Sequence, residues 1–168
     1  GEMSTHQLSL SEGDIISYVH SVCNSFLLMA DKKHIQFSFF SGIDTFSMAF
    51  DADKVGKIVM NLLSNAVKFT PESGEIVLDI AAVERRNGYA HLRFVLSDTG
   101  VGISEDFMHR LFHPFEQENK ETSRNNIGSG LGLSIVYNLV RMMGGSISVK
   151  SRKRRGTSFT VLLPLEVQ

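Results

Sequence analysis

A two-residue turn at Asn87-Gly88 joins two strand-like segments, and this pair constrains the fold more than any other feature of the sequence. Asn-Gly is typical of a tight hairpin turn, because both positions tolerate positive φ. The flanking segments 74–86 and 89–98 should therefore pair as antiparallel neighbours. A sheet built on such a pair needs helices to cover its apolar face.

The other segments show helix or strand patterns in alternation. Apolar residues recur at helical spacing over 14–33, with Asp14 as N-cap, and a second helix begins at Asp51 and runs to Phe69. The segments 34–40 and 45–50 carry a hairpin signal between them. We expect an α/β (α+β) two-layer sandwich, with a mixed, largely antiparallel sheet and helices on one face. Further strands are expected at 6–12, 146–151 and 157–164, and further helices at 104–112 and 131–145.

The composition is that of an ordinary globular protein. The chain has 168 residues and a net charge of −1, which suits one domain and argues against a nucleic-acid-binding surface. The basic cluster Lys150–Arg155 is better interpreted as a solvated hairpin turn. The single cysteine, Cys23, is expected to be a buried structural thiol. No apolar run reaches the roughly 18 residues that a membrane span needs. We expect one domain at 8–166, after an N-terminal tail or linker remnant at 1–7.

The helix that ends at Phe69 has an unusual polar stripe. Asn61, Asn65 and Lys68 fall opposite its apolar face. By pattern alone, a stripe that faces water is the favoured interpretation. Asparagines are poor helix formers, however, and an amide oxygen is a hard neutral ligand suited to Mg²⁺. The helix alone leaves both interpretations open.

Two glycine motifs follow in the sequence. "DTGVGIS" at 98–104 comes after a strand, and Asp98 offers a carboxylate that can accept from an exocyclic amine. "GSGLGLS" at 128–134 opens a helix, whose free N–H groups and dipole attract anions. Either motif alone could equally be structural. Neither is a Walker A loop or a dinucleotide fingerprint. The unpatterned segment between them, 113–130, is long enough to be a functional loop or disordered.

Four elements in order carry a family resemblance. They are N-x-x-x-N-A-x-K-F at 61–69, D-x-G-x-G at 98–102, F-x-P-F at 112–115 and G-x-G-L-G-L at 128–133. Together they resemble the N, G1, F and G2 boxes of the catalytic ATP-binding domain of sensor histidine kinases, over nearly the whole chain.

The resemblance implies a site for ATP and Mg²⁺. Asn65 resembles the magnesium ligand, Asn61 and Lys68 resemble phosphate contacts, and Asp98 resembles the reader of the adenine amino group. A mobile ATP lid is implied at about 116–129. Lys120 and Arg124 in this lid are candidate phosphate contacts. The other implied nucleotide-binding residues are Phe69, Gly100, Gly102, Ile103, Gly128, Ser129, Gly130, Leu131, Gly132, Leu133 and Thr157.

Two departures bear on the chemistry. Hydrolysing relatives of this fold carry Glu where this sequence has Asn61, and an amide cannot act as general base. Transfer to a protein acceptor is therefore favoured over rapid hydrolysis. In addition, none of the six histidines has the H-E-x-x-x-P-like context of the family's phosphoacceptor. The alternatives are a hydrolysing ATPase of the same fold and a degenerate interaction module that does not bind ATP.

The resemblance also implies partners. The phosphoacceptor histidine would lie on an upstream helical dimerisation domain, and Phe112 and Phe115 could dock that domain or pack in the core. A response regulator receiver would act downstream. No contact with nucleic acid or membrane is implied for this domain, which would be cytoplasmic even where the parent protein is membrane-anchored.

Overall fold

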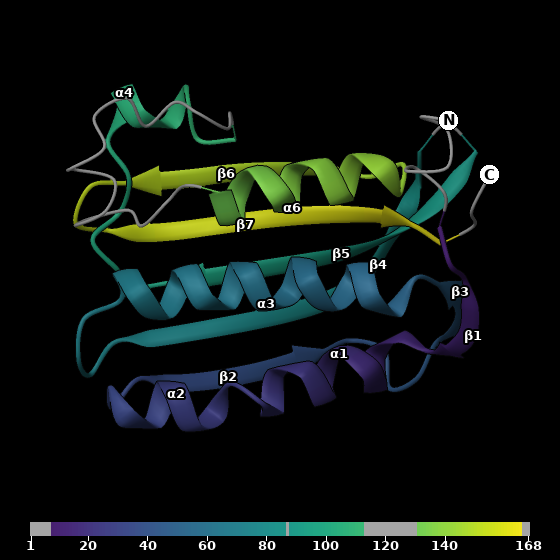
Figure 1. The fold of residues 1–168 in the computed structure, drawn as a ribbon, viewed down its shortest axis with the longest axis horizontal. Helices are drawn as coiled ribbons and strands as arrows, with labels where there is room; N and C mark the ends of the chain where they lie inside the picture. Colours follow the sequence, from purple (N-terminus) through teal and green to yellow (C-terminus); the bar gives the residue numbers. More distant parts are fainter. Residues whose placement is uncertain (1–7, 87, 113–130, 166–168) are drawn as a thin grey trace.

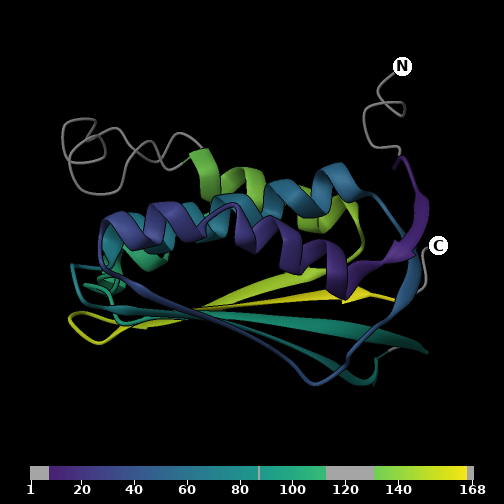
Figure 2. The same ribbon diagram turned by 90° about the horizontal axis from the view of Figure 1, so that it is seen from below.

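The computed structural model describes residues 8–86, 88–112 and 131–165, and its helices cover one face of a twisted sheet (Figures 1 and 2). This is the expected two-layer α/β sandwich. The helices are α1 (Ile15–Asn24), α2 (Leu27–Lys32), α3 (Ala52–Phe69), α4 (Glu105–Met108) and α6 (Leu131–Met142). The strands are β1 (Ser11–Asp14), β2 (Gln36–Ser41), β3 (Ser47–Phe50), β4 (Glu75–Arg86), β5 (Tyr89–Asp98), β6 (Ser146–Arg152) and β7 (Gly156–Pro164).

The main sheet has the strand order β2-β4-β5-β7-β6 and is largely antiparallel, as expected. The β4–β5 hairpin is confirmed, and Gly88 in its turn has φ +85°. The β6–β7 hairpin is also confirmed, with Lys153–Arg155 exposed in its turn. Only β2 runs parallel to its neighbour, β4.

The predicted hairpin between 34–40 and 45–50 is wrong. The first segment, β2, joins the main sheet beside β4, while β3 pairs with β1 in a separate two-stranded sheet. The reason lies where α1 begins. Ile15 N donates to Phe46 O at 3.0 Å, and Phe46 N donates to the Asp14 carboxylate at 2.9 Å. These bonds hold the approach to β3 against β1 and α1 rather than against β2.

The single helix predicted over 14–33 is divided into α1 and α2. Ser25 ends α1, where its hydroxyl donates to Val22 O at 2.6 Å. Phe26 remains buried across the break, so the apolar periodicity does not reveal it. The N-cap at Asp14 is confirmed, since its carboxylate accepts from Ile16 N. Three other predicted elements differ from the structure at their ends. β1 begins only at Ser11, against a strand predicted at 6–12. α4 ends at Met108 and α6 at Met142, short of the predicted 104–112 and 131–145.

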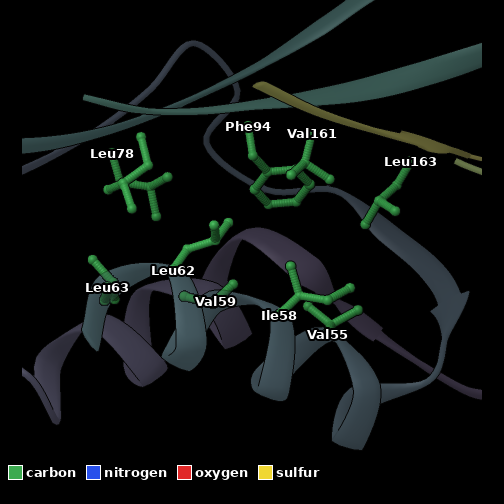
Figure 3. Close-up of a pocket in the computed structure, with 10 residues that line it drawn as sticks. Val55, Ile58, Val59, Leu62, Leu63, Leu78, Phe94, Val161 and Leu163 are labelled. Atoms are coloured by element: carbon green, nitrogen blue, oxygen red, sulfur yellow. The ribbon is translucent and has the colours of Figure 1, made fainter. Parts of the chain in front are cut away.

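The apolar face of α3 forms the centre of the core. Figure 3 shows its side chains pointing at Leu78, Phe94, Val161 and Leu163 of the sheet. The hollow between them has a volume of only about 20 Å³ and is lined by apolar side chains alone, so it offers a water no hydrogen-bond partner. Burying this face fixes which way the polar stripe of α3 points.

Cys23 is buried in the core, as expected, and burial raises the pKa of its thiol to about 12. Such a thiol is unreactive at neutral pH. Within the described residues, no helix is long and apolar enough to cross a membrane.

The N-cap of α3 generates a testable prediction. The Asp51 carboxylate is buried and accepts from Ser9 N at 2.9 Å and Lys54 N at 3.1 Å. Burial raises its pKa, but these bonds and the Lys54 ammonium outweigh burial and lower it overall. Because the unfolded value is about 3.9, the stabilisation is complete above that pH and is lost as pH falls through the folded-state pKa. Asp51→Asn puts an NH₂ group against one of these two donors and removes the charge, so it should lower the free energy of unfolding by about 1–2 kcal/mol at pH 7.

Urea unfolding from pH 7 to pH 3 measures this effect, and the gap between wild type and Asp51→Asn should close toward acid. The control is Asp53→Asn in the same helical turn. Asp53 is 74% exposed in its ion pair with Lys57, so the change should be within about 0.5 kcal/mol. An Asp51→Asn loss that is the same at pH 7 and pH 3 would contradict the charge-based account.

Candidate functional site

A pocket of about 420 Å³ opens beside the polar stripe of α3. It lies between α3, the segment that follows β5, and the start of β7. Seven residues implied by the sequence resemblance line this pocket: Asn65, Phe69, Asp98, Gly102, Ile103, Leu133 and Thr157. Segments between Asn65 and Phe159 that are far apart in the sequence therefore meet at one site.

Asp98 stands at one end of the pocket, at the last position of β5. Its Oδ1 accepts from Gly100 N at 2.8 Å and from Thr157 N at 3.2 Å. Within the described part of the chain, Oδ2 has no hydrogen-bond partner, so it can accept from a ligand. Burial raises the pKa of Asp98, and the two N–H donors partly offset that rise.

The loop after Asp98 runs close to two other elements. Val101 N donates to Phe69 O at 3.2 Å, and Arg154 N donates to Val101 O at 2.5 Å. Gly102 has φ +78°, and a Cβ there would collide with the backbone carbonyl of Arg152. A glycine is therefore required where this loop passes the β6–β7 hairpin. The loop is held between the end of α3 and the hairpin.

α3 also meets the start of α6, at Asn61 and Gly132, which do not line the pocket. A Cβ on Gly132 would lie 3.1 Å from Asn61 Oδ1, so the first turn of α6 passes directly beside the asparagine stripe. Asn61 Nδ2 donates to Lys57 O at 2.7 Å, which leaves the amide oxygen toward α6. The N-terminus of a helix attracts anions, and here it lies next to two neutral amides.

Not all of the implied residues line the pocket. Lys68 is exposed on the last turn of α3 and is absent from the lining, and Gly100 is buried and acts through its N–H bond to Asp98. Phe112 packs against Tyr137 and Phe159, with ring centroids 5.6 Å and 6.3 Å apart, which supports a packing role. The following lie outside the described residues: Phe115, the lid at 116–129, Lys120, Arg124, Gly128, Ser129, Gly130 and the side chain of Leu131.

Sequence reasoning missed seven residues of the lining: Ala66, Val101, Ser104, Phe107, Leu111, Lys153 and Phe159. A signal existed for Phe159, because residues two apart on a strand share a face and Thr157 was already implicated. Lys153 belongs to the basic hairpin, whose turn reaches the pocket only through the tertiary fold. Nothing in the local sequence indicates that contact.

The residues present suit Mg²⁺ held jointly with phosphates rather than a metal cage made by protein alone. Among the described residues, no group of three or more His, Cys, Asp or Glu could hold a metal ion. Asn65 lines the pocket and offers one neutral oxygen ligand. Mg²⁺ commonly binds through one or two protein ligands together with substrate phosphates.

The chain resembles known proteins over most of its length. Residues 50–167 match the family described as histidine kinase-, DNA gyrase B-, and HSP90-like ATPase. Hybrid signal transduction histidine kinase D of Dictyostelium discoideum is 32% identical over 164 residues, which are 98% of this chain and 11% of that protein. Autoinducer 2 sensor kinase/phosphatase LuxQ of Vibrio parahaemolyticus serotype O3:K6 is 47% identical over 118 residues, which are 69% of this chain and 14% of that protein.

A solved structure gives the same picture. Full-length ShkA in complex with AMPPNP has a TM-score of 0.79 at 30% identity, over 96% of this chain and 32% of that one. The chain thus spans 11% and 14% of these two relatives and about a third of this structure. With the family match covering well over half of the chain, the protein belongs to the histidine kinase-, DNA gyrase B-, and HSP90-like ATPase family, as the ATP-binding domain of a two-component sensor histidine kinase.

Proposed function

We propose that this domain binds Mg-ATP in the pocket beside α3 and donates the γ-phosphoryl group to a histidine on a separate domain. The observation that carries the proposal is the meeting of Asp98, Asn65 and Thr157 in one pocket next to the start of α6. The residues present fit such a nucleotide. The domain boundaries that we propose are 8–166, with the lid at 116–129.

At the base end, Asp98 receives the adenine amino group. Its Oδ1 is occupied by Gly100 N and Thr157 N, so Oδ2 is the oxygen that can accept from a ligand. The apolar side chains of Ile103, Leu133 and Phe159 would enclose a purine ring. An acceptor set among apolar walls favours a flat base with an exocyclic donor.

At the phosphate end, the donors come from helices. The start of α6 lies beside Asn61, where the N-terminal end of a helix favours anions, and Asn65 would ligate Mg²⁺ together with phosphate oxygens. Lys68, Lys120 and Arg124 are proposed as further phosphate contacts. Bound ATP supplies the transferable phosphoryl group, and the residues of this chain hold and orient it.

The site residues favour transfer over hydrolysis. Asn61 stands where a hydrolysing relative would have a carboxylate, and its amide donates to Lys57 O. An amide cannot take a proton from water at neutral pH. No histidine of the described residues lines the pocket: His20 stacks on Phe39, and His34 pairs with Glu72. None of the six histidines in the sequence has the context of a phosphoacceptor either, so we propose an acceptor histidine on another domain.

The proposed acceptor lies on an upstream helical dimerisation domain, and a response regulator receiver is the proposed downstream partner. The Dictyostelium relative, a hybrid signal transduction histidine kinase, has most of its length outside the matched region, which leaves room for such domains. The packing of Phe112 against Tyr137 argues against a docking role for Phe112, whereas Phe115 lies outside the described residues.

The first prediction from the proposed function concerns Asp98. Asp98→Asn keeps one oxygen for Gly100 N and Thr157 N but places an NH₂ group where the base amine must approach. Isothermal titration with ADP and Mg²⁺ should show a loss of affinity of roughly tenfold to a hundredfold. Asp79→Asn, on an exposed position of β4, is the control and should bind like wild type. Equal affinity of Asp98→Asn and wild type would exclude Asp98 as the base reader.

The second prediction concerns Mg²⁺. Asn65→Ala removes the proposed ligand, so the gain in ADP affinity on adding Mg²⁺ should shrink by roughly tenfold. Affinity without Mg²⁺ should change little. Ser64→Ala, at the exposed neighbouring position on α3, should retain the full gain. An unaltered Mg²⁺ effect in Asn65→Ala would place the ion elsewhere.

The third prediction separates transfer from hydrolysis. Wild type alone should release phosphate from ATP far more slowly than about one turnover per second, a low rate for a dedicated enzyme. A coupled phosphate-release assay measures this rate. Steady turnover at or above that value would favour the hydrolysing ATPase instead. Wild type that is folded yet binds neither ATP nor ADP would support the degenerate interaction module.

A further inference from the structure

The hydroxyl of Ser151, on β6, lies at the centre of a hydrogen-bond cluster behind the base end of the pocket. Three atoms surround its Oγ: Ile103 N at 2.8 Å, Gly156 O at 3.0 Å and Thr157 Oγ1 at 2.8 Å. Ile103 and Thr157 line the pocket, whereas Ser151 does not. Ser151 therefore touches two wall residues without meeting a ligand itself.

Counting protons assigns a direction to each of these bonds. A serine hydroxyl has one proton and two acceptor positions. Gly156 O can only accept, so that bond uses the single proton of Ser151. Ile103 N can only donate, so that bond uses one acceptor position. The contact with Thr157 Oγ1 must then be a bond in which Thr157 donates, which fills the last position on Ser151.

The same count fixes what Thr157 presents to the pocket. Its only hydroxyl proton points at Ser151, so a ligand that reaches Oγ1 meets lone pairs. Thr157 N meanwhile donates to Asp98 Oδ1 at 3.2 Å, which holds Thr157 beside the carboxylate. This wall of the pocket therefore carries two acceptors, Asp98 Oδ2 and Thr157 Oγ1.

We infer that Ser151 is a positioning residue that locks the Thr157 hydroxyl as an acceptor, and so makes the pocket select a purine with an amino group over one with a carbonyl at the same ring position. This inference rests on the proposed nucleotide binding. A 6-amino group brings donors to the two acceptors. A 6-oxopurine such as hypoxanthine brings a carbonyl in place of the amine and only one donor at this edge, its N1–H. At least one of the two acceptors is then left unpaired, which is costly.

The test compares ADP with inosine 5′-diphosphate, which carries the carbonyl, by isothermal titration on the whole chain. Wild type should prefer ADP. In Ser151→Ala the Thr157 hydroxyl loses its acceptor and can turn to donate to the ligand, so the preference should fall by about threefold to tenfold. Ser151→Thr keeps a hydroxyl and should keep the preference. A merely structural role for Ser151 would weaken both nucleotides by the same factor.

The matched control is Ser158→Ala. The Ser158 hydroxyl bonds Ser97 Oγ at 2.9 Å, and neither residue lines the pocket. This variant removes a similar hydroxyl contact from the same sheet and should leave the ADP preference unchanged. Hydrogen exchange at the Ile103 amide gives a second readout without nucleotide: it should speed up in Ser151→Ala and not in Ser158→Ala.

Unchanged preference or unchanged Ile103 exchange in folded Ser151→Ala would overturn the inference while leaving nucleotide binding intact. If Ser151→Ala does not fold, the Thr157→Val variant provides the test, because loss of the Oγ1 acceptor should reduce the preference for ADP over inosine 5′-diphosphate by a similar factor. An unreduced preference in Thr157→Val would also overturn the inference. Wild type that binds neither nucleotide would instead defeat the proposed function, and this inference with it.

Discussion

Two backbone N–H groups converge on one oxygen of Asp98, and the proposed base end of the site is arranged around this interaction. One donor, Gly100, belongs to the loop that follows β5, and the other, Thr157, belongs to β7. The carboxylate thus holds the loop against the neighbouring strand with one oxygen and keeps the other for a ligand. Burial disfavours the charged form and the two donors favour it, so the same bonds that shape the loop also maintain the acceptor.

Helix α3 connects this site to the core. Its apolar face packs against β4, β5 and β7 (Figure 3), and rotating it would expose Leu62 and Leu63, which are buried. The direction of Asn61 and Asn65 is therefore set by hydrophobic packing on the opposite side of the helix. The close approach of Gly132 to Asn61 then places the start of α6 against the same stripe. The geometry of the proposed phosphate end therefore follows from the packing of α3 on the sheet.

Sequence patterns predicted the features of the fold and the site that depend on neighbouring residues. The β4–β5 and β6–β7 hairpins, the N-cap at Asp14 and the start of α3 at Asp51 all have signals within a few residues, as do the motif residues that line the pocket: Asn65, Phe69, Asp98, Gly102 and Leu133. The β2–β3 error arose because a hairpin signal does not reveal competing long-range bonds, here from Ile15 N and the Asp14 carboxylate to Phe46. Lys153 and Phe107 reach the pocket only through tertiary packing, so the sequence motifs do not predict that they line it. The break between α1 and α2 was hidden because Phe26 stays in phase with the buried face.

The two ends of the proposed site are built differently, and the difference matters for the chemistry. The base end rests on paired strands, where Asp98 and Thr157 face each other in register and Ser151 completes the hydrogen bonding behind them. Sites on such elements are held closely, which suits discrimination between bases. The proposed phosphate end combines the start of α6 with neutral amides of α3, and Asn61 is already bonded to its own helix. In the proposed reaction these groups can orient a phosphate but cannot take a proton, so the nucleophile and its proton acceptor must arrive with the partner domain.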